Sequence, residues 1–317
     1  MWRRNNEDDT DAGIRPTLRR CGWGRRAPMT ASDSYSPSVL ERAEGGYAMV
    51  ALDQRESMRD LLVTSDRSDE AMRSFKATAA SELSAYASAI LLDRVYGIDQ
   101  RPPAWASTTP LILAADVFDQ PAGQPVATST LDTSVTPDYV RAAGASALKF
   151  LALWRSGDDI SERADLVASF IRLAHDAGVP AVVEGIVRAD SGTWAGMEER
   201  DDAIVACAAE LAGLGADLYK AEVPGTTAEL SSVESGSRRI SDVVNCPWVV
   251  LSNGVPPTDF PDAVEAACAG GASGFLAGRA IWTAAAAADD TAAALRNDAV
   301  GRFLAISKRV PRTAVVA

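Results

Sequence analysis

Eight short apolar runs recur along this chain, and each is followed by a longer stretch in which apolar residues have helical spacing. The runs occupy residues 47–54, 89–93, 110–118, 147–154, 180–187, 218–224, 247–255 and 274–282. Most of them are continuously apolar, which is typical of strands buried on both faces of a parallel sheet. This alternation constrains the fold more than any other feature, because parallel strands need helices to connect them and to cover them.

The segments between the runs fit helices with ordinary ends. An apolar stripe at helical spacing continues through residues 162–177 and stops at Gly178, and residues 199–214 repeat the pattern up to Gly215. Eight such units without a break in composition predict a single (β/α)₈ TIM barrel over residues 37–317. An open doubly wound sheet is the alternative. Residues 1–36 lack an apolar stripe and a secretory signal, so we expect a disordered N-terminal extension.

Composition excludes several classes of function. The net charge of -12 disfavours nucleic acid and anionic membranes as partners, and no apolar run approaches the ~20 residues that span a bilayer. Cys21, Cys207, Cys246 and Cys268 have no metal-binding spacing, which indicates reduced thiols and a cytoplasmic protein. His175 is the one histidine, and its place at a helix end favours a structural role. We therefore expect no metal and no cofactor.

Polar residues recur at the carboxyl ends of the runs, where barrel enzymes build their active sites. They are Asp53, Gln54 and Arg55 in the first run and just after it, Asp93 in the second, Lys149 in the fourth, Glu184 in the fifth, Lys220 in the sixth, Ser252, Asn253 and Gly254 in the seventh, and Gly278 and Arg279 in the eighth. Because these ends meet at one face of a barrel, we expect the side chains to share a pocket.

The lysines are the most specific of these residues. Only four of the 31 basic residues are lysines, yet Lys149 and Lys220 both lie inside apolar runs. Burying an ammonium costs several kcal/mol, and arginine cannot replace a lysine that acts as an uncharged nucleophile. Burial and a neighbouring cation both lower the pKa of a lysine, so the pair favours a nucleophilic amine. The alternative is a pair of structural salt bridges to Glu184 and Glu222.

Two further patterns fit the same pocket. Glu184 lies within an apolar run, where a carboxyl group can pass protons or act as a counter-ion. The last two runs contain small residues and Arg279, and exposed backbone N–H groups with a guanidinium bind phosphate oxygens. Barrels commonly bind phosphate at that position, so we expect a phosphate site there.

These residues carry a family resemblance. The chain resembles the class I aldolases that include tagatose-1,6-bisphosphate aldolase, and more closely the bacterial sulfofructosephosphate aldolases among them. The similar segments are residues 45–59, 86–93, 147–159, 215–224, 247–255 and 271–282.

The resemblance implies a Schiff-base lysine at Lys220, a proton-handling carboxylate at Glu184 and an assisting Lys149. It also implies phosphate contacts from Ser252, Gly278 and Arg279, hydroxyl contacts from Asp53, Gln54 and Arg55, and a homotetramer. The segment Trp154-Arg155-Ser156 favours the closer relatives. Arg55 and Arg155, which follow the first and fourth runs, are the expected contacts for an anion at the far end of the substrate.

The expected reaction is cleavage of a small sugar phosphate, 6-deoxy-6-sulfofructose 1-phosphate, to dihydroxyacetone phosphate and 3-sulfolactaldehyde. One alternative is a tagatose- or fructose-1,6-bisphosphate aldolase. The other is a barrel that has lost catalysis and binds a sugar phosphate as a sensor.

Overall fold

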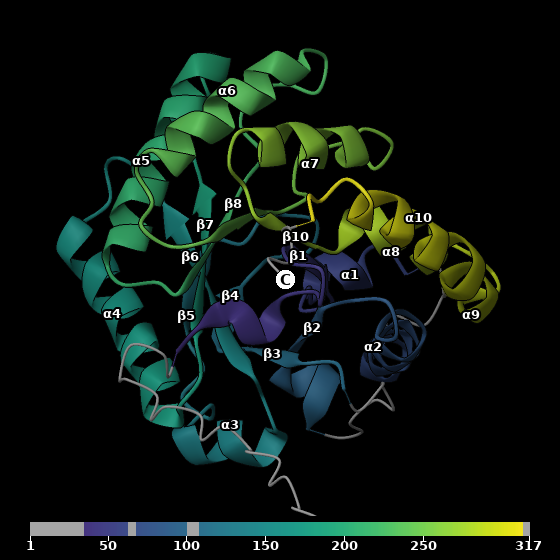
Figure 1. The fold of residues 1–317 in the computed structure, drawn as a ribbon. Coiled ribbons are helices and arrows are strands. Elements are labelled where there is room, and N and C mark those ends of the chain that lie inside the picture. Colours follow the sequence, from purple (N-terminus) through teal and green to yellow (C-terminus); the bar gives the residue numbers. More distant parts are fainter. Residues whose placement is uncertain (1–34, 63–67, 100–107, 313–317) are drawn as a thin grey trace, which may run out of the picture.

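The computed structural model describes residues 35–62, 68–99 and 108–312, and within them eight parallel strands close into a barrel (Figure 1). Around the barrel the strands are β1 (Tyr47–Ala51), β2 (Ala89–Asp93), β3 (Leu111–Ala114), β6 (Ala147–Trp154), β7 (Ala181–Val187), β8 (Leu218–Ala221), β9 (Trp248–Val250) and β10 (Gly274–Ala277), which pairs with β1. The predicted barrel is confirmed, and the open sheet is excluded. Residues 1–34 of the expected extension lie outside the described residues.

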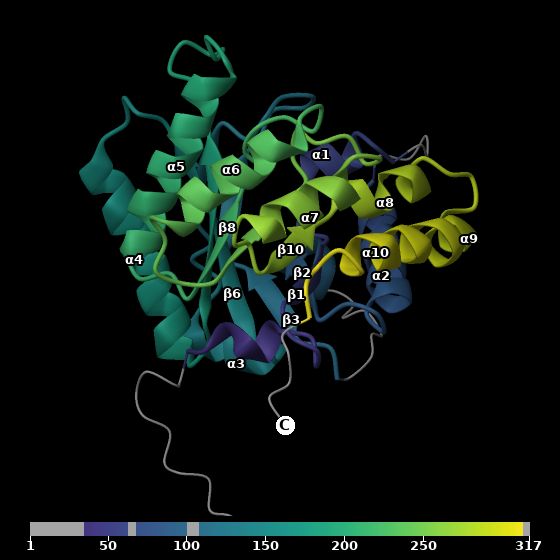
Figure 2. The same ribbon diagram turned by 45° about the horizontal axis from the view of Figure 1, so that its top comes forward.

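Helices form a layer outside the barrel. They are α1 (Glu56–Arg59), α2 (Asp69–Leu83), α3 (Pro137–Ala143), α4 (Ile160–Ala177), α5 (Met197–Gly213), α6 (Leu230–Ser241), α7 (Phe260–Ala269), α8 (Arg279–Ala286), α9 (Thr291–Ala294) and α10 (Val300–Ser307), with short turns η1 (Pro37–Leu40), η2 (Arg94–Ile98) and η3 (Leu295–Ala299). Figure 2 shows α4 and α5 on one flank and α2, α9 and α10 on the opposite one. No helix within the described ranges is long and apolar enough to cross a bilayer.

Alternation along the strands decides which side chains enter the barrel. Successive strand residues point to opposite faces, so Ala147, Val182 and Leu218 pack in the barrel interior while their neighbours pack against the helices. Lys149, Glu184 and Lys220 each lie two positions further along the same strand and therefore face inward too. Strand pairing adds the register, because Glu184 on β7 is level with Lys220 on β8.

Two of the predicted runs are not single strands. Residues 110–118 divide into β3 and β4 (Asp116–Asp119), and β4 forms an antiparallel hairpin with β5 (Thr128–Leu131). The last run ends as a strand at Ala277, because the chain enters α8 at Arg279 and its apolar residues there pack as a helix face. Apolar runs alone do not distinguish a buried strand from the first turn of a buried helix.

Gly274 allows the barrel to close, and we predict that Gly274→Ala destabilises it. Gly274 pairs with Tyr47 across the β10–β1 junction, its φ is 143°, and an added Cβ would lie 2.0 Å from the Tyr47 carbonyl oxygen. Strain of this kind should lower the free energy of unfolding by roughly 1–3 kcal/mol or more, measured by urea denaturation. Gly301→Ala in α10 is the control, because an added Cβ there meets nothing within 4 Å. Its stability should be unchanged or raised by up to ~1 kcal/mol.

Candidate active site

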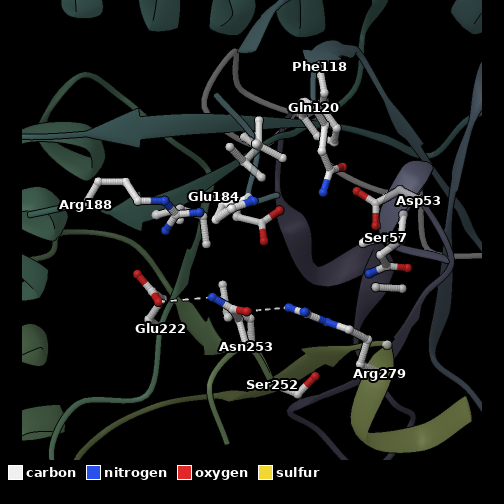
Figure 3. Close-up of a pocket in the computed structure, with 18 of the residues that line it drawn as sticks. Asp53, Ser57, Phe118, Gln120, Glu184, Arg188, Glu222, Ser252, Asn253 and Arg279 are labelled. Carbon is white, nitrogen blue, oxygen red and sulfur yellow. Dashed lines mark hydrogen bonds between the residues drawn. The ribbon is translucent and has the colours of Figure 1, made fainter. Parts of the chain in front are cut away.

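A cavity of about 710 Å³ opens at the carboxyl ends of the strands. Ten of the residues expected from the sequence line it: Asp53, Gln54, Arg55, Lys149, Glu184, Lys220, Ser252, Asn253, Gly278 and Arg279. Figure 3 shows Glu184 near the middle of the cavity and Arg279 and Ser252 at one side. Loop residues beyond β4, including Gln120 and Gln124, also contribute to the lining.

Glu184 joins the two lysines. Its Oε1 lies 3.0 Å from the Lys220 Nζ and its Oε2 lies 2.7 Å from the Lys149 Nζ. All three residues are more than nine-tenths buried. A structural salt bridge and a catalytic role would both bring the lysines this close to Glu184. The other neighbours of each lysine distinguish these two hypotheses.

Lys149 is enclosed by carboxylates. Besides Glu184, its Nζ contacts the Asp53 Oδ2 at 2.8 Å and the Asp116 Oδ2 at 3.1 Å. Burial favours the neutral amine, but the charges of Asp116, Asp53 and Glu184 outweigh it and raise the pKa of Lys149. Burial also opposes ionisation of Asp53, yet Lys149 and Lys220 hold the pKa of that carboxyl well below its ordinary value. Lys149 and Asp53 are therefore both charged at neutral pH.

Asp116 is a site residue that the sequence reasoning missed. Its Oδ2 contacts Lys149 and accepts a hydrogen bond from the Leu151 backbone at 3.0 Å, and its Oδ1 lies 2.9 Å from the Arg55 Nη2. Arg55 also donates to the Asp116 carbonyl at 2.8 Å and stacks over Phe118. Arg55 thus supports the Lys149 cluster. Asp116 follows the third strand, so the strand-end rule that selected the other residues could have found it.

Three predicted residues lie outside the cavity lining. Asp93 is fully buried in an ion pair with Lys76 of α2, and it accepts a hydrogen bond from the Tyr96 backbone at 2.8 Å, so it offers no surface to a substrate. The Arg155 Nη1 lies 3.6 Å from Asp158. Gly254 lies in the turn after β9. Arg188, which follows β7 and was not predicted, lines the cavity instead.

The expected phosphate site lies at the beginning of α8. The N-cap residue Gly278 has no side chain to cap that helix, and the Ala280 N–H donates a hydrogen bond to the Ser252 Oγ at 3.5 Å. Gly278 lets the chain pass close to β1 just before the helix, because a Cβ there would lie 2.5 Å from the Ala51 carbonyl oxygen. The positive end of a helix dipole with an arginine beside it favours an anion.

Asn253 lines the cavity beside Arg279 and has protein partners for both its amide atoms. Its Oδ1 accepts a hydrogen bond from the Arg279 Nη2, and its Nδ2 donates to the Glu222 Oε1 at 3.3 Å (Figure 3). The amide therefore links Arg279 to Glu222, and its polar atoms already have protein partners. Asn253 positions the arginine of the anion site.

Comparison with known proteins identifies the family. The family model for DeoC/LacD family aldolases matches residues 47–284, which span every barrel strand and the whole cavity. The chain belongs to this aldolase family. It is a class I aldolase, a lyase of carbon–carbon bonds.

Individual relatives of the aldolase are distant. Tagatose 1,6-diphosphate aldolase 1 of Streptococcus pyogenes is 25% identical over 268 residues, which are 75% of this chain and 81% of the relative. A class 1 fructose-bisphosphate aldolase of Halobacterium salinarum is 30% identical over 149 residues, 46% of this chain and 52% of the relative. An archaeal fructose 1,6-bisphosphate aldolase structure superposes with a TM-score of 0.62 at 19% identity, covering 89% of this chain and 99% of the other. Fructose-bisphosphate aldolase from Plasmodium falciparum superposes with a TM-score of 0.68 at 13% identity, covering 90% of this chain and 96% of the other. These two structures share the fold.

We predict that Asp116→Asn strongly destabilises the aldolase. The change leaves Lys149 and Arg55 with one negative charge fewer in a buried site, which should cost about 3–5 kcal/mol in the free energy of unfolding. Urea denaturation at pH 7 measures it. Asp119→Asn at the exposed end of β4 is the matched control and should stay within ~0.5 kcal/mol of the wild type. Equal small effects from both variants would show that Asp116 does not stabilise the cluster.

Proposed function

We propose that the aldolase cleaves a ketose 1-phosphate through a Schiff base on Lys220. The observation that supports this most is the unequal surroundings of the two lysines. Lys149 is held by three carboxylates, whereas Glu184 is the one carboxylate within 4.0 Å of Lys220 in the described part of the chain. A lysine held charged cannot attack a carbonyl, so Lys220 is the nucleophile and Lys149 the permanent cation.

Glu184 is placed to carry each proton of the reaction. It takes a proton from the Lys220 ammonium 3.0 Å away, and the free amine attacks the ketone carbon. Glu184 returns that proton as the carbinolamine loses water to give an iminium ion. It then takes the proton of the C4 hydroxyl as the C3–C4 bond breaks, the bonding electrons move into the iminium, and the aldehyde leaves. Protonation of the enamine carbon by Glu184 and hydrolysis release the second product and Lys220.

The neighbours of Glu184 keep it in place for these steps. Lys149 contacts the Glu184 oxygen that Lys220 does not, so each oxygen of the carboxylate has its own lysine partner. Lys149 is thus a positioning residue in this mechanism, because its amine need not touch the substrate.

The proposed substrate is 6-deoxy-6-sulfofructose 1-phosphate, which gives dihydroxyacetone phosphate and 3-sulfolactaldehyde. The C1 phosphate fits the beginning of α8, where Ser252, Gly278 and Arg279 meet. The sulfonate is favoured by the sequence resemblance through residues 147–159. Tagatose or fructose 1,6-bisphosphate is the alternative substrate, since the curated relatives are named for these sugars.

We predict that borohydride traps dihydroxyacetone phosphate on Lys220. Reduction of the imine should add one adduct per chain, and peptide mapping by mass spectrometry should place it on the peptide that contains Lys220. Lys220→Met should form no adduct. An adduct on Lys149 would reverse the two roles, and the absence of any adduct in the wild type would favour the non-catalytic sensor.

We also predict a preference among the substrates. The value of kcat/KM for 6-deoxy-6-sulfofructose 1-phosphate should exceed the values for tagatose and fructose 1,6-bisphosphate by roughly tenfold. The reason is charge matching, because a single arginine balances the one negative charge of a sulfonate but not the about 1.5 to 2 charges of a phosphate monoester at pH 7. Initial rates of release of dihydroxyacetone phosphate measure all three. A higher kcat/KM for either bisphosphate would show that the enzyme prefers a phosphate to a sulfonate at C6.

A further inference from the structure

Arg188 is a cation of the cavity that lacks a carboxylate partner. It follows β7, and Figure 3 shows its side chain entering from the side opposite to Arg279. Its Nη1 donates to the Val187 carbonyl at 2.9 Å. Within the described ranges no carboxylate oxygen lies within 4.0 Å of its guanidinium nitrogens. Most of the hydrogen-bonding capacity of this guanidinium is therefore available to a ligand.

The other arginines that line the cavity are held by protein groups. Arg55 is held by Asp116, Arg200 by Glu222 at 3.6 Å and Asp201 at 3.8 Å, and Arg279 by Asn253. Of the two arginines expected from the sequence to bind a distal anion, Arg55 is paired with Asp116 and Arg155 is outside the lining. Arg188 and Arg279 are thus the two lining arginines without a carboxylate within 4.0 Å in the described ranges, and Arg188 also lacks the side-chain partner that Asn253 gives Arg279.

The surroundings of Arg188 favour an arriving anion. Burial lowers its pKa, Glu222 opposes that effect, and the cations Arg155 and Arg279 add to it. A bound anion would replace the lost hydration of the guanidinium and relieve repulsion from the other two arginines. The planar fork of an arginine also matches the oxygens of a sulfonate or a phosphate.

We propose that Arg188 determines specificity by binding the anionic group at C6 of the ketose, on the half that leaves as the aldehyde. This inference rests on the proposed function, because it takes Lys220 as the attachment point. Ser252 and Arg279 then hold the C1 phosphate on one side of Lys220. The C6 group extends to the opposite side, where Arg188 enters.

Glu222 limits the charge that this site accepts. Its Oε2 accepts a hydrogen bond from the Val187 N–H at 2.9 Å, and the Arg188 Nη1 donates to the carbonyl of the same residue, so the backbone of Val187 holds both charged groups. A carboxylate in that place repels a dianion more than a monoanion. A sulfonate carries one negative charge, whereas a phosphate monoester carries about 1.5 to 2 at pH 7. We therefore expect the part of the Glu222 charge that Arg200 does not offset, 3.6 Å away, to favour a sulfonate over a phosphate.

The test is the reverse reaction with dihydroxyacetone phosphate and three acceptors. They are 3-sulfolactaldehyde, glyceraldehyde 3-phosphate and uncharged glyceraldehyde. The readout is kcat/KM for each anionic acceptor divided by kcat/KM for glyceraldehyde. In Arg188→Gln the ratio for sulfolactaldehyde should fall roughly 10- to 150-fold, and Arg188→Lys should recover part of the loss. Arg155→Gln is the comparison variant and should lower the ratio less than Arg188→Gln, because Arg155 lies outside the cavity lining and contributes only its charge.

Each outcome decides the proposal. A larger fall for glyceraldehyde 3-phosphate would keep Arg188 as the distal contact but reject the charge limit set by Glu222. Equal losses for all three acceptors would make Arg188 structural and overturn the proposal, as would a fall confined to Arg155→Gln. Failure of the Schiff-base function itself would look different, because the wild type would then add dihydroxyacetone phosphate to no acceptor and form no adduct on Lys220.

Discussion

The buried charge of Lys149 is the interaction on which the rest of the active site depends. An ammonium ion in the protein interior costs several kcal/mol unless anions surround it. Here Asp53 follows β1, Asp116 begins β4 and Glu184 lies on β7, so the three carboxylates converge only when the barrel closes. Folding and assembly of the site are therefore the same event.

The ionised groups of this cluster are balanced. Lys149, Lys220 and Arg55 carry three positive charges, and Asp53, Asp116 and Glu184 carry three negative ones when all six are ionised. Transfer of a proton from Lys220 to Glu184 leaves the total unchanged. The proton transfers that an imine mechanism requires can therefore occur in the low-dielectric interior, because the net charge of the cluster does not change.

The sequence predicted the barrel and most of the site because both follow from periodicity. Lys149, Glu184 and Lys220 stand out as charged residues in apolar runs, and alternation along a strand turns all three inward. The same rule was wrong for Asp93, since Lys76 on a helix 17 residues earlier pairs with it. It was also applied incompletely, because Asp116 follows the third strand in the same way. Arg155 and Arg188 are both strand-end arginines, and nothing local in the sequence ranks one above the other.

By itself the sequence determined the eight β–α units and which strand positions face inward, because a period of two residues is a property of each strand alone. The tertiary structure decided which charges meet. Lys149 contacts Asp53 from 96 residues away, and Asn253 joins Glu222 to Arg279 across three different strand ends. Such pairings depend on barrel closure and register, which set distances between segments that are remote in the chain, and electrostatic energy depends on those distances.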